Sequence, residues 1–154
     1  MELNKLIKNV FTEEQIGYLR DIAFNGETHL CQERGRNDVF IGPDIRQDIK
    51  DKVKSYFDEG YELYHVTYSE YSPDHGIPNL PEHRDPKYDH TSLTFDYQFE
   101  ANVIWPMCAE GICHDMKDND ALIFDPQNMD HLRPPRDFKP GDYVRVFFFF
   151  LKKV

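Results

Sequence analysis

Apolar residues recur at helical spacing in two segments of the first sixty residues. The first segment follows Thr12, whose hydroxyl, with the amide of Gln15, forms the pattern of a helix-capping box. One face of this predicted helix carries Ile16, Leu19 and Ile22. The second segment begins at Pro43, and its apolar face carries Ile45, Ile49, Val53 and Phe57. We therefore expect two amphipathic helices, with short strands before the first (residues 3–11) and between the two (39–41).

After Gly60 the pattern changes to one typical of β-strands, with aromatic and β-branched residues bounded by turn-forming residues. The predicted strands cover residues 61–71, 91–99, 102–105, 121–124 and 143–151. Helices followed by many short strands indicate a mainly β member of the α+β class: a double-stranded β-helix (jelly roll) barrel with flanking N-terminal helices. We expect a single domain over residues 1–154, with a helical flank (1–60) and a β-helix core (61–154).

Composition narrows the functional classes. The formal net charge of −10 argues against nucleic acid as the main partner, because phosphate neutralisation requires clustered Lys and Arg. The longest apolar run, residues 146–151, is far shorter than the roughly 20 residues that span a bilayer. The N-terminus has no signal-peptide pattern, so we expect a cytoplasmic protein without membrane contact. The 3 cysteines are odd in number and unevenly spaced, which makes a disulfide scaffold an unfavoured expectation.

Three residues form the candidate metal site: His83 and Asp85, separated by one residue, and the distant His131. With 7 His and 28 acidic residues in 154, chance alone gives 7 × 28/154, or about 1.3, His-x-acid triplets, so the triplet itself is weak evidence. Its placement is more informative, because it follows a proline-rich loop at the start of a predicted strand. Two imidazoles and one carboxylate form the facial triad of non-haem Fe(II) oxygenases.

Other histidines and cysteines offer weaker alternatives. His90 could replace His131 only if all the ligands came from one loop, and His114 lies in a polar turn; both are expected to be exposed to solvent. Cys108, Cys113 and His114 could bind zinc, but their spacing matches no common zinc motif and a fourth ligand is not evident.

Arg145 is the candidate anchor for an acidic ligand. Strand alternation places it on one face with Tyr143, Phe147 and Phe149. A guanidinium among apolar neighbours needs an anion, and a bidentate carboxylate satisfies it best. That anion is either a ligand or a protein acid such as Asp120, and Arg133 is the alternative anchor.

These residues resemble the Fe(II)- and 2-oxoglutarate-dependent dioxygenases, most of all their prolyl-hydroxylase branch. The resemblance extends over nearly the whole chain, from the first strand and helix to the closing strand with Arg145. It implies that His83, Asp85 and His131 hold Fe(II), and that Arg145, joined by Tyr71 with Tyr68 as the alternative, binds the cosubstrate 2-oxoglutarate.

The resemblance implies an oxidoreductase that uses O2 to hydroxylate a C–H bond of a peptide or a small molecule, with peptidyl proline as the leading substrate. Two departures bear on this reading. The interval from His131 to Arg145 is longer than is usual in the branch, and residues 101–106 replace its usual Gly-Gly segment. The alternative is a non-catalytic, cupin-like barrel that binds a metal or a ligand.

Overall fold

The computed structural model describes residues 1–87 and 90–154. Its two α-helices are α1 (Glu13–Phe24) and α2 (Gln47–Lys54). Thr12 and Gln15 form the predicted capping box at the start of α1, since each side chain binds the backbone of the other residue. Two short 3₁₀ turns, η1 (Gln32–Arg34) and η2 (Pro73–His75), lie in the connections.

The strands form two antiparallel sheets, which confirms the predicted mainly β fold. The large sheet contains, in spatial order, β1 (Leu6–Ile7), β9 (Ala121–Phe124), β6 (Leu93–Ala101), β11 (Val144–Lys153), β4 (Tyr61–Tyr71), β3 (Arg36–Phe40) and β2 (His29–Cys31). The small sheet contains β5 (Leu80–His83), β10 (His131–Arg133), β7 (Met107–Ala109) and β8 (Ile112–His114).

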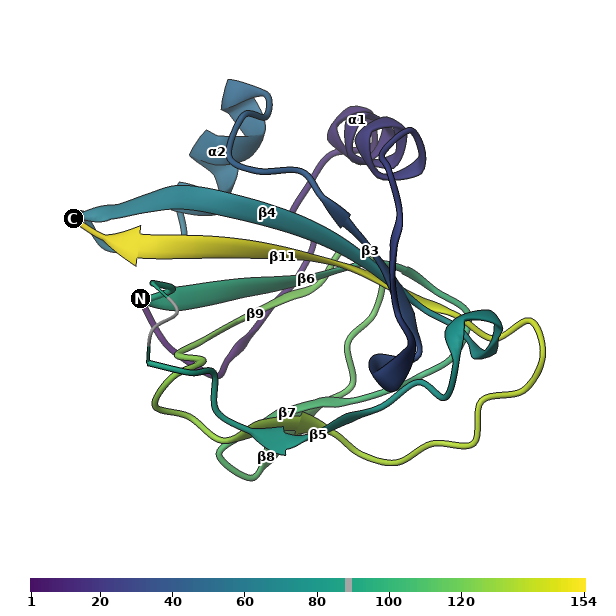
Figure 1. Cartoon of the computed structure of the whole chain (residues 1–154). Coiled ribbons are helices and arrows are strands. Elements are labelled where there is room, and N and C mark those ends of the chain that lie inside the picture. Colours follow the sequence, from purple (N-terminus) through teal and green to yellow (C-terminus); the bar gives the residue numbers. More distant parts are fainter. Residues whose placement is uncertain (88–89) are drawn as a thin grey trace.

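The large sheet separates two layers of the molecule (Figure 1). Both helices cover its outer face, and the small sheet lies opposite its inner face. Alternate residues of each strand therefore point either to the helices or to the other sheet. The outer face forms the main hydrophobic core, in which Phe95, Phe147 and Phe149 pack with Leu19 of α1 and Ile49 of α2.

Several elements differ from the predictions. Residues 102–105 form no strand: Asn102 closes a turn by binding the backbone of Tyr143 and Gly141, and Pro106 lacks the N–H that a strand ladder requires. The N-terminal strand is limited to β1, and Asn9 beyond it has a positive φ of 55°. Residues 1–60 are not only a helical flank, because β1, β2 and β3 join the large sheet.

A disulfide joins Cys108 and Cys113, contrary to the sequence-based expectation. The two cysteines are direct partners in the antiparallel β7–β8 hairpin, so their side chains lie on the same side of it. The odd cysteine is accounted for by Cys31, which is free. Among the described residues, no helix has the length and apolar character needed to cross a membrane.

Candidate metal centre

The pairing of β5 with β10 brings the two histidines together. His131, the first residue of β10, is the direct antiparallel partner of His83, the last residue of β5. Asp85 follows β5 by two residues, and its backbone N–H donates to the carbonyl of Pro126 at 2.7 Å. Two histidines 48 positions apart in the sequence thus meet at one edge of the small sheet.

The side chains converge on one point. One ligand atom from each of His83, Asp85 and His131 lies within 4.8 Å of the others. The Asp85 Oδ1 atom is 3.5 Å from Nε2 of His83 and 3.3 Å from Nε2 of His131. The two imidazole rings have centroids 4.2 Å apart and do not stack in parallel, their planes meeting at 55°. Two nitrogens and one oxygen in this arrangement suit a divalent transition metal.

Backbone carbonyls orient both imidazoles. Nδ1 of His83 donates to the carbonyl of Pro81 at 2.7 Å, and Nδ1 of His131 donates to that of Met129 at 2.9 Å. Because Nδ1 carries the proton in each ring, Nε2 is the nitrogen left to bind a metal. Metal-ligating histidines in proteins usually have this second hydrogen bond.

The electrostatics of the three groups also favour a cation. Partial burial opposes ionisation of Asp85, but hydrogen bonds from His131 and His83 outweigh it and lower the pKa of Asp85 to about 2. The same contact with Asp85 raises the pKa of His83, against the effect of burial. A divalent cation bound between these atoms would replace the proton that His83 shares with Asp85. The donor set therefore fits a metal ion.

Two glycines allow the close backbone contacts that position β5, and with it His83. Gly35, with a φ of +62°, lies against the backbone of Ile77 and Pro78, where a Cβ would come within 2.3 Å of the Pro78 nitrogen. Gly76 has a φ of +128°, and its Cβ would lie 2.6 Å from the carbonyl oxygen of Gln32. Only glycine permits these approaches at positive φ. The loop before His83 is thereby held against the η1–β3 connection.

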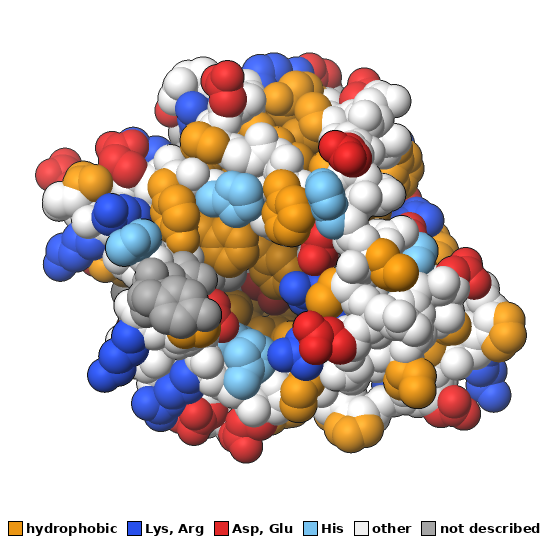
Figure 2. Space-filling view, viewed as in Figure 1, with side chains coloured by type: hydrophobic (Ala, Val, Ile, Leu, Met, Phe, Trp, Pro, Cys, Tyr) orange, Lys and Arg blue, Asp and Glu red, His pale blue; other side chains and the backbone are white. Residues whose placement is uncertain are grey.

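A cavity of about 130 Å³ extends from the three candidate ligands into the space between the sheets. Besides those residues, its walls include the side chains of Arg36, Thr94, Phe124, Phe148 and Phe150. Figure 2 shows the molecule hollowed on this side, with a hydrophobic interior that also contains charged groups. The triad thus lies beside a largely apolar cavity, as a site for organic ligands requires.

Arg145, which the resemblance assigns to 2-oxoglutarate, does not line this cavity. The predicted alternation is right, but the face that Arg145 shares with Phe147 and Phe149 is the one covered by the helices. Its Nε atom binds Glu70 at 2.7 Å, and its Nη1 atom binds Glu100. Protein carboxylates thus supply the anion that the sequence required, although Asp120 is not one of them.

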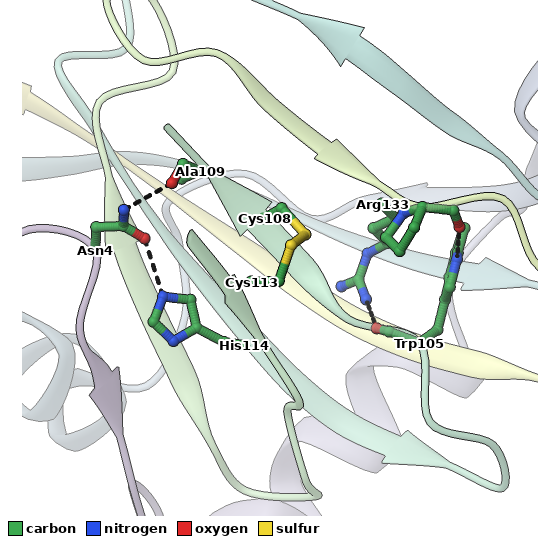
Figure 3. Close-up of a disulfide and its surroundings, with 8 residues drawn as sticks. Asn4, Trp105, Cys108, Ala109, Cys113, His114 and Arg133 are labelled. Carbon is green, nitrogen blue, oxygen red and sulfur yellow. Dashed lines mark hydrogen bonds between the residues drawn. A yellow bond between two sulfur atoms is a disulfide. The ribbon is translucent and has the colours of Figure 1, made fainter. Parts of the chain in front are cut away.

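Arg133, the alternative anchor, points to the interior. It is two residues after His131 on β10, so both side chains lie on the same face. Its Nη1 atom donates to the carbonyl of Trp105 at 2.7 Å, as Figure 3 shows, while Nε and Nη2 have no hydrogen-bond partner. The side chains of Arg133 and Asp96 are 0% exposed and 3.8 Å apart, too far for a hydrogen bond.

Other buried polar atoms on the inner face of the large sheet also lack partners. Both carboxylate oxygens of Asp96 and the hydroxyl of Thr94 are buried without a partner, and both residues belong to the inner face of β6. Burial raises the pKa of Asp96, although Arg133 and His131 partly oppose this effect. Buried polar groups without partners are costly, so this cluster is suited to an additional polar ligand.

The two tyrosines occupy different faces of β4. Tyr71 is fully buried on the inner face, where its hydroxyl accepts a hydrogen bond from Nη1 of Arg36 at 2.8 Å and its ring packs against Trp105. Tyr68 packs against Phe147 on the helix side, so it is not available as the alternative to Tyr71 near the cavity.

The competing ligands lie elsewhere. His90 is exposed, as predicted, and lies outside the His83–Asp85–His131 cluster. His114 is not in an unstructured turn: it ends β8, and its Nε2 atom is 3.0 Å from Oδ1 of Asn4 (Figure 3). Since Cys108 and Cys113 form a disulfide, their sulfur atoms are not available for the alternative zinc site.

Two charged residues near the candidate centre were not predicted from the sequence: Arg36 lines the cavity, and a carboxylate oxygen of Asp96 lies 3.8 Å from Nη2 of Arg133. The strand expected at residues 39–41 does not reach Arg36, and the strand expected at residues 91–99 contains Asp96 without a predicted role. A charged residue at an inward position of a strand is a usable signal for Asp96. The position of Arg36 follows only from the pairing of β3 with β4, which no local pattern specifies.

Comparison with known proteins adds a fold-level finding. No protein-family model and no curated protein matches the chain. Among solved structures, it is similar to a prolyl-4-hydroxylase of Pseudomonas putida (TM-score 0.69, 12% identity, 97% of this chain and 92% of that chain). A 2OG-Fe(II) oxygenase-family oxidoreductase of Burkholderia pseudomallei gives a TM-score of 0.71 at 8% identity, over 96% of this chain and 84% of the other.

A third similar structure is a Trichoplax adhaerens prolyl hydroxylase in complex with a peptide fragment of hypoxia inducible factor (TM-score 0.62, 14% identity, 95% of this chain and 82% of that chain). The chain therefore has a jelly-roll fold similar to that of these solved structures. Prolyl hydroxylases are among its structural neighbours, in agreement with the resemblance noted in the sequence.

Proposed function

We propose that this protein is an Fe(II)- and 2-oxoglutarate-dependent dioxygenase that hydroxylates a C–H bond. The observation that carries the proposal is the convergence of His83, Asp85 and His131, with both Nδ1 atoms bonded to carbonyls and both Nε2 atoms directed at Asp85. The oxygenase-type fold supports it. When bound, the iron, 2-oxoglutarate and O2 would supply the oxidising power, which side chains lack.

We assign the binding of the distal carboxylate of 2-oxoglutarate to Arg133. Its free Nε and Nη2 atoms form the fork that binds a carboxylate in a bidentate manner. Residues two apart on a strand are roughly 7 Å apart, which is comparable to the length of a five-carbon dicarboxylate extending from the metal at His131. Asp96, whose pKa burial raises, lies beside Arg133 and in its protonated form would donate a hydrogen bond to this carboxylate.

Arg36 is the competing anchor because it lines the cavity and also binds Tyr71. Its guanidinium is already engaged by Asp38 at 3.0 Å and by the Tyr71 hydroxyl. Arg133 lacks such partners on two of its nitrogens, which favours Arg133. In this assignment Arg36 and Tyr71 stabilise the wall of the cavity.

The finer proposal is that the substrate is a peptide, with proline as the leading target. Two of the similar structures are prolyl hydroxylases, and one of them contains a peptide. The apolar walls of the cavity, which include Phe124, Phe148 and Phe150, suit an uncharged ring.

Release of succinate from 2-oxoglutarate under air tests the proposal. The Fe(II)-loaded protein should release succinate, and Asp85→Ala and His131→Ala should abolish the release because each removes a ligand. His90→Ala is the matched control, since His90 is an exposed histidine outside the cluster. Metal binding without any succinate release, or release that survives Asp85→Ala, would refute the proposal. The former outcome would favour a non-catalytic metal-binding barrel.

A further inference from the structure

A continuous row of aromatic rings crosses the inner face of the large sheet. It consists of five residues, defined here as the aromatic row: His29, Phe40, His65, Phe150 and Phe148. Successive ring centroids are separated by 5.0, 6.3, 5.8 and 6.1 Å. These residues come from strands β2, β3, β4 and β11, so the row runs across the strands.

The row connects the open edge of the sheet to the candidate metal centre. Phe148 and Phe150 line the cavity beside the triad, whereas Phe40 is 58% exposed near the edge. Figure 2 shows histidine and hydrophobic side chains following one another along the rim of the hollow. Large apolar side chains exposed in a contiguous set usually mark a binding surface rather than a core.

The spacing of the rings indicates the kind of ligand. Alternate side chains of an extended polypeptide repeat at roughly 6.6–6.8 Å, which is close to the ring separations of the row. Five rings are more than a single small molecule of the size of the cavity would contact. A chain lying along the row would thus place successive side chains between neighbouring rings and deliver one residue into the cavity.

The charges near the aromatic row indicate which kind of polymer would bind there. The depression at the outer end of the row is lined by His29, Phe40, Glu33 and Asp38, whose charge is paired with Arg36 at 3.0 Å, and by no Lys or Arg. A phosphate backbone would find no cluster of cations here, whereas nucleic-acid surfaces combine aromatic rings with clustered cations. The row is therefore better suited to a polypeptide than to a nucleic acid.

We infer that the aromatic row is the substrate-binding surface, and that it holds an extended, uncharged or basic polypeptide segment with apolar side chains at alternate positions. The inference rests on the proposed function only in that the peptide residue entering the cavity would be the one that is hydroxylated. The binding itself requires neither iron nor oxygen.

The test is a selection of random decapeptides by mRNA display against the wild-type protein with Mn(II) and 2-oxoglutarate, followed by anisotropy measurements on labelled winners. Recovered peptides should be poor in Asp and Glu. Phe40→Ala should weaken their binding at least five-fold, and Phe40→Trp should restore it because the ring is retained. Ile112→Ala, at a position that is 54% exposed on β8 of the other sheet, should leave the affinity unchanged.

Equal peptide affinities of the wild type and Phe40→Ala would overturn the inference. Binding of labelled (dT)10 with no peptide recovered would also overturn it, in favour of a nucleic acid. Because binding is measured without turnover, a protein that binds peptides but releases no succinate would contradict the proposed function alone. Succinate release without peptide selection would contradict this inference alone.

Discussion

Arg145 of β11 is the direct antiparallel partner of Glu70 on β4, and the two side chains form a hydrogen-bonded ion pair at 2.7 Å. Glu100 on β6, the strand on the other side of β11, binds the same guanidinium. Three adjacent strands are thus joined on the helix-covered face by one arginine. This arrangement gives Arg145 a structural role and separates it from the candidate metal centre.

Replacing Arg145 should therefore affect stability and not ligand binding. Arg145→Met leaves two partly buried carboxylates without their common partner, and we expect the free energy of unfolding to fall by about 1–3 kcal/mol. The dissociation constant for 2-oxoglutarate, measured anaerobically with Mn(II), should stay within two-fold of the wild type. A large loss of 2-oxoglutarate affinity in a folded Arg145→Met protein would restore the original assignment.

Arg133 and Arg36 can be separated by the same titration. Loss of a charged, bidentate contact costs about 1.5–3 kcal/mol, which corresponds to roughly ten- to hundred-fold in the dissociation constant. Arg133→Met should weaken 2-oxoglutarate binding by this amount. Arg36→Met should weaken it by less than five-fold, because Arg36 already binds Tyr71 and Asp38.

The reverse order of these two effects would assign the anchor to Arg36. A structural defect is detected by a second ligand: Mn(II) alone should bind both variants as it binds the wild type, since neither arginine contributes to the His83–Asp85–His131 cluster. Loss of Mn(II) binding in Arg133→Met would show that the residue acts by holding β10 in place.

The sequence correctly predicted those helices and strands whose residues show a clear local pattern. The capping box at Thr12 and the strands predicted at residues 61–71 and 121–124 lie where the sequence placed them. The strands β8 and β10 were missed because three-residue strands carry too few positions to show a period. Pairing determines that they are strands: β10 pairs with β5 and β7, both distant in the sequence, and β8 pairs with the adjacent β7.

The candidate metal site, too, was predictable only as far as local patterns in the sequence allow. His83, Asp85 and His131 could be selected because the ligand types and their order are informative without knowledge of the register. The position of Arg145 could not be predicted, because alternation groups residues on a face but does not say which face meets the helices. That choice depends on the complete strand order, in which β11 lies between β4 and β6.

The Glu70 carboxylate should make stability depend on pH. Partial burial opposes its ionisation, but hydrogen bonds from His75 and Arg145 outweigh this and lower the pKa of Glu70 below its ordinary value. A pKa that is lower in the folded state contributes stability that is present above the unfolded value, about 4.3, and is lost as the pH falls through the folded value.

Glu70→Gln should consequently be less stable than the wild type at neutral pH, and the difference should shrink when urea unfolding is repeated at about pH 3. The matched control is Glu62→Gln, at an exposed residue of the same strand that is paired with Lys54 at the surface. If the stability difference between Glu70→Gln and the wild type grew on acidification, the ion pair would not be the cause.

Reduction of the Cys108–Cys113 disulfide should destabilise the protein and loosen the metal centre. The bridge closes a loop of only six residues, so the entropic effect on the unfolded chain is small, about 2 kcal/mol. Its location matters more, because β7 pairs with β10 and places Ala109 directly beside His131. We expect the free energy of urea unfolding to fall by about 2 kcal/mol in dithiothreitol, with Mn(II) binding weakened several-fold.

A thiol assay of the denatured, unreduced chain should detect Cys31 alone. Detection of all three cysteines as thiols, or identical unfolding with and without reductant, would show that the bridge does not form.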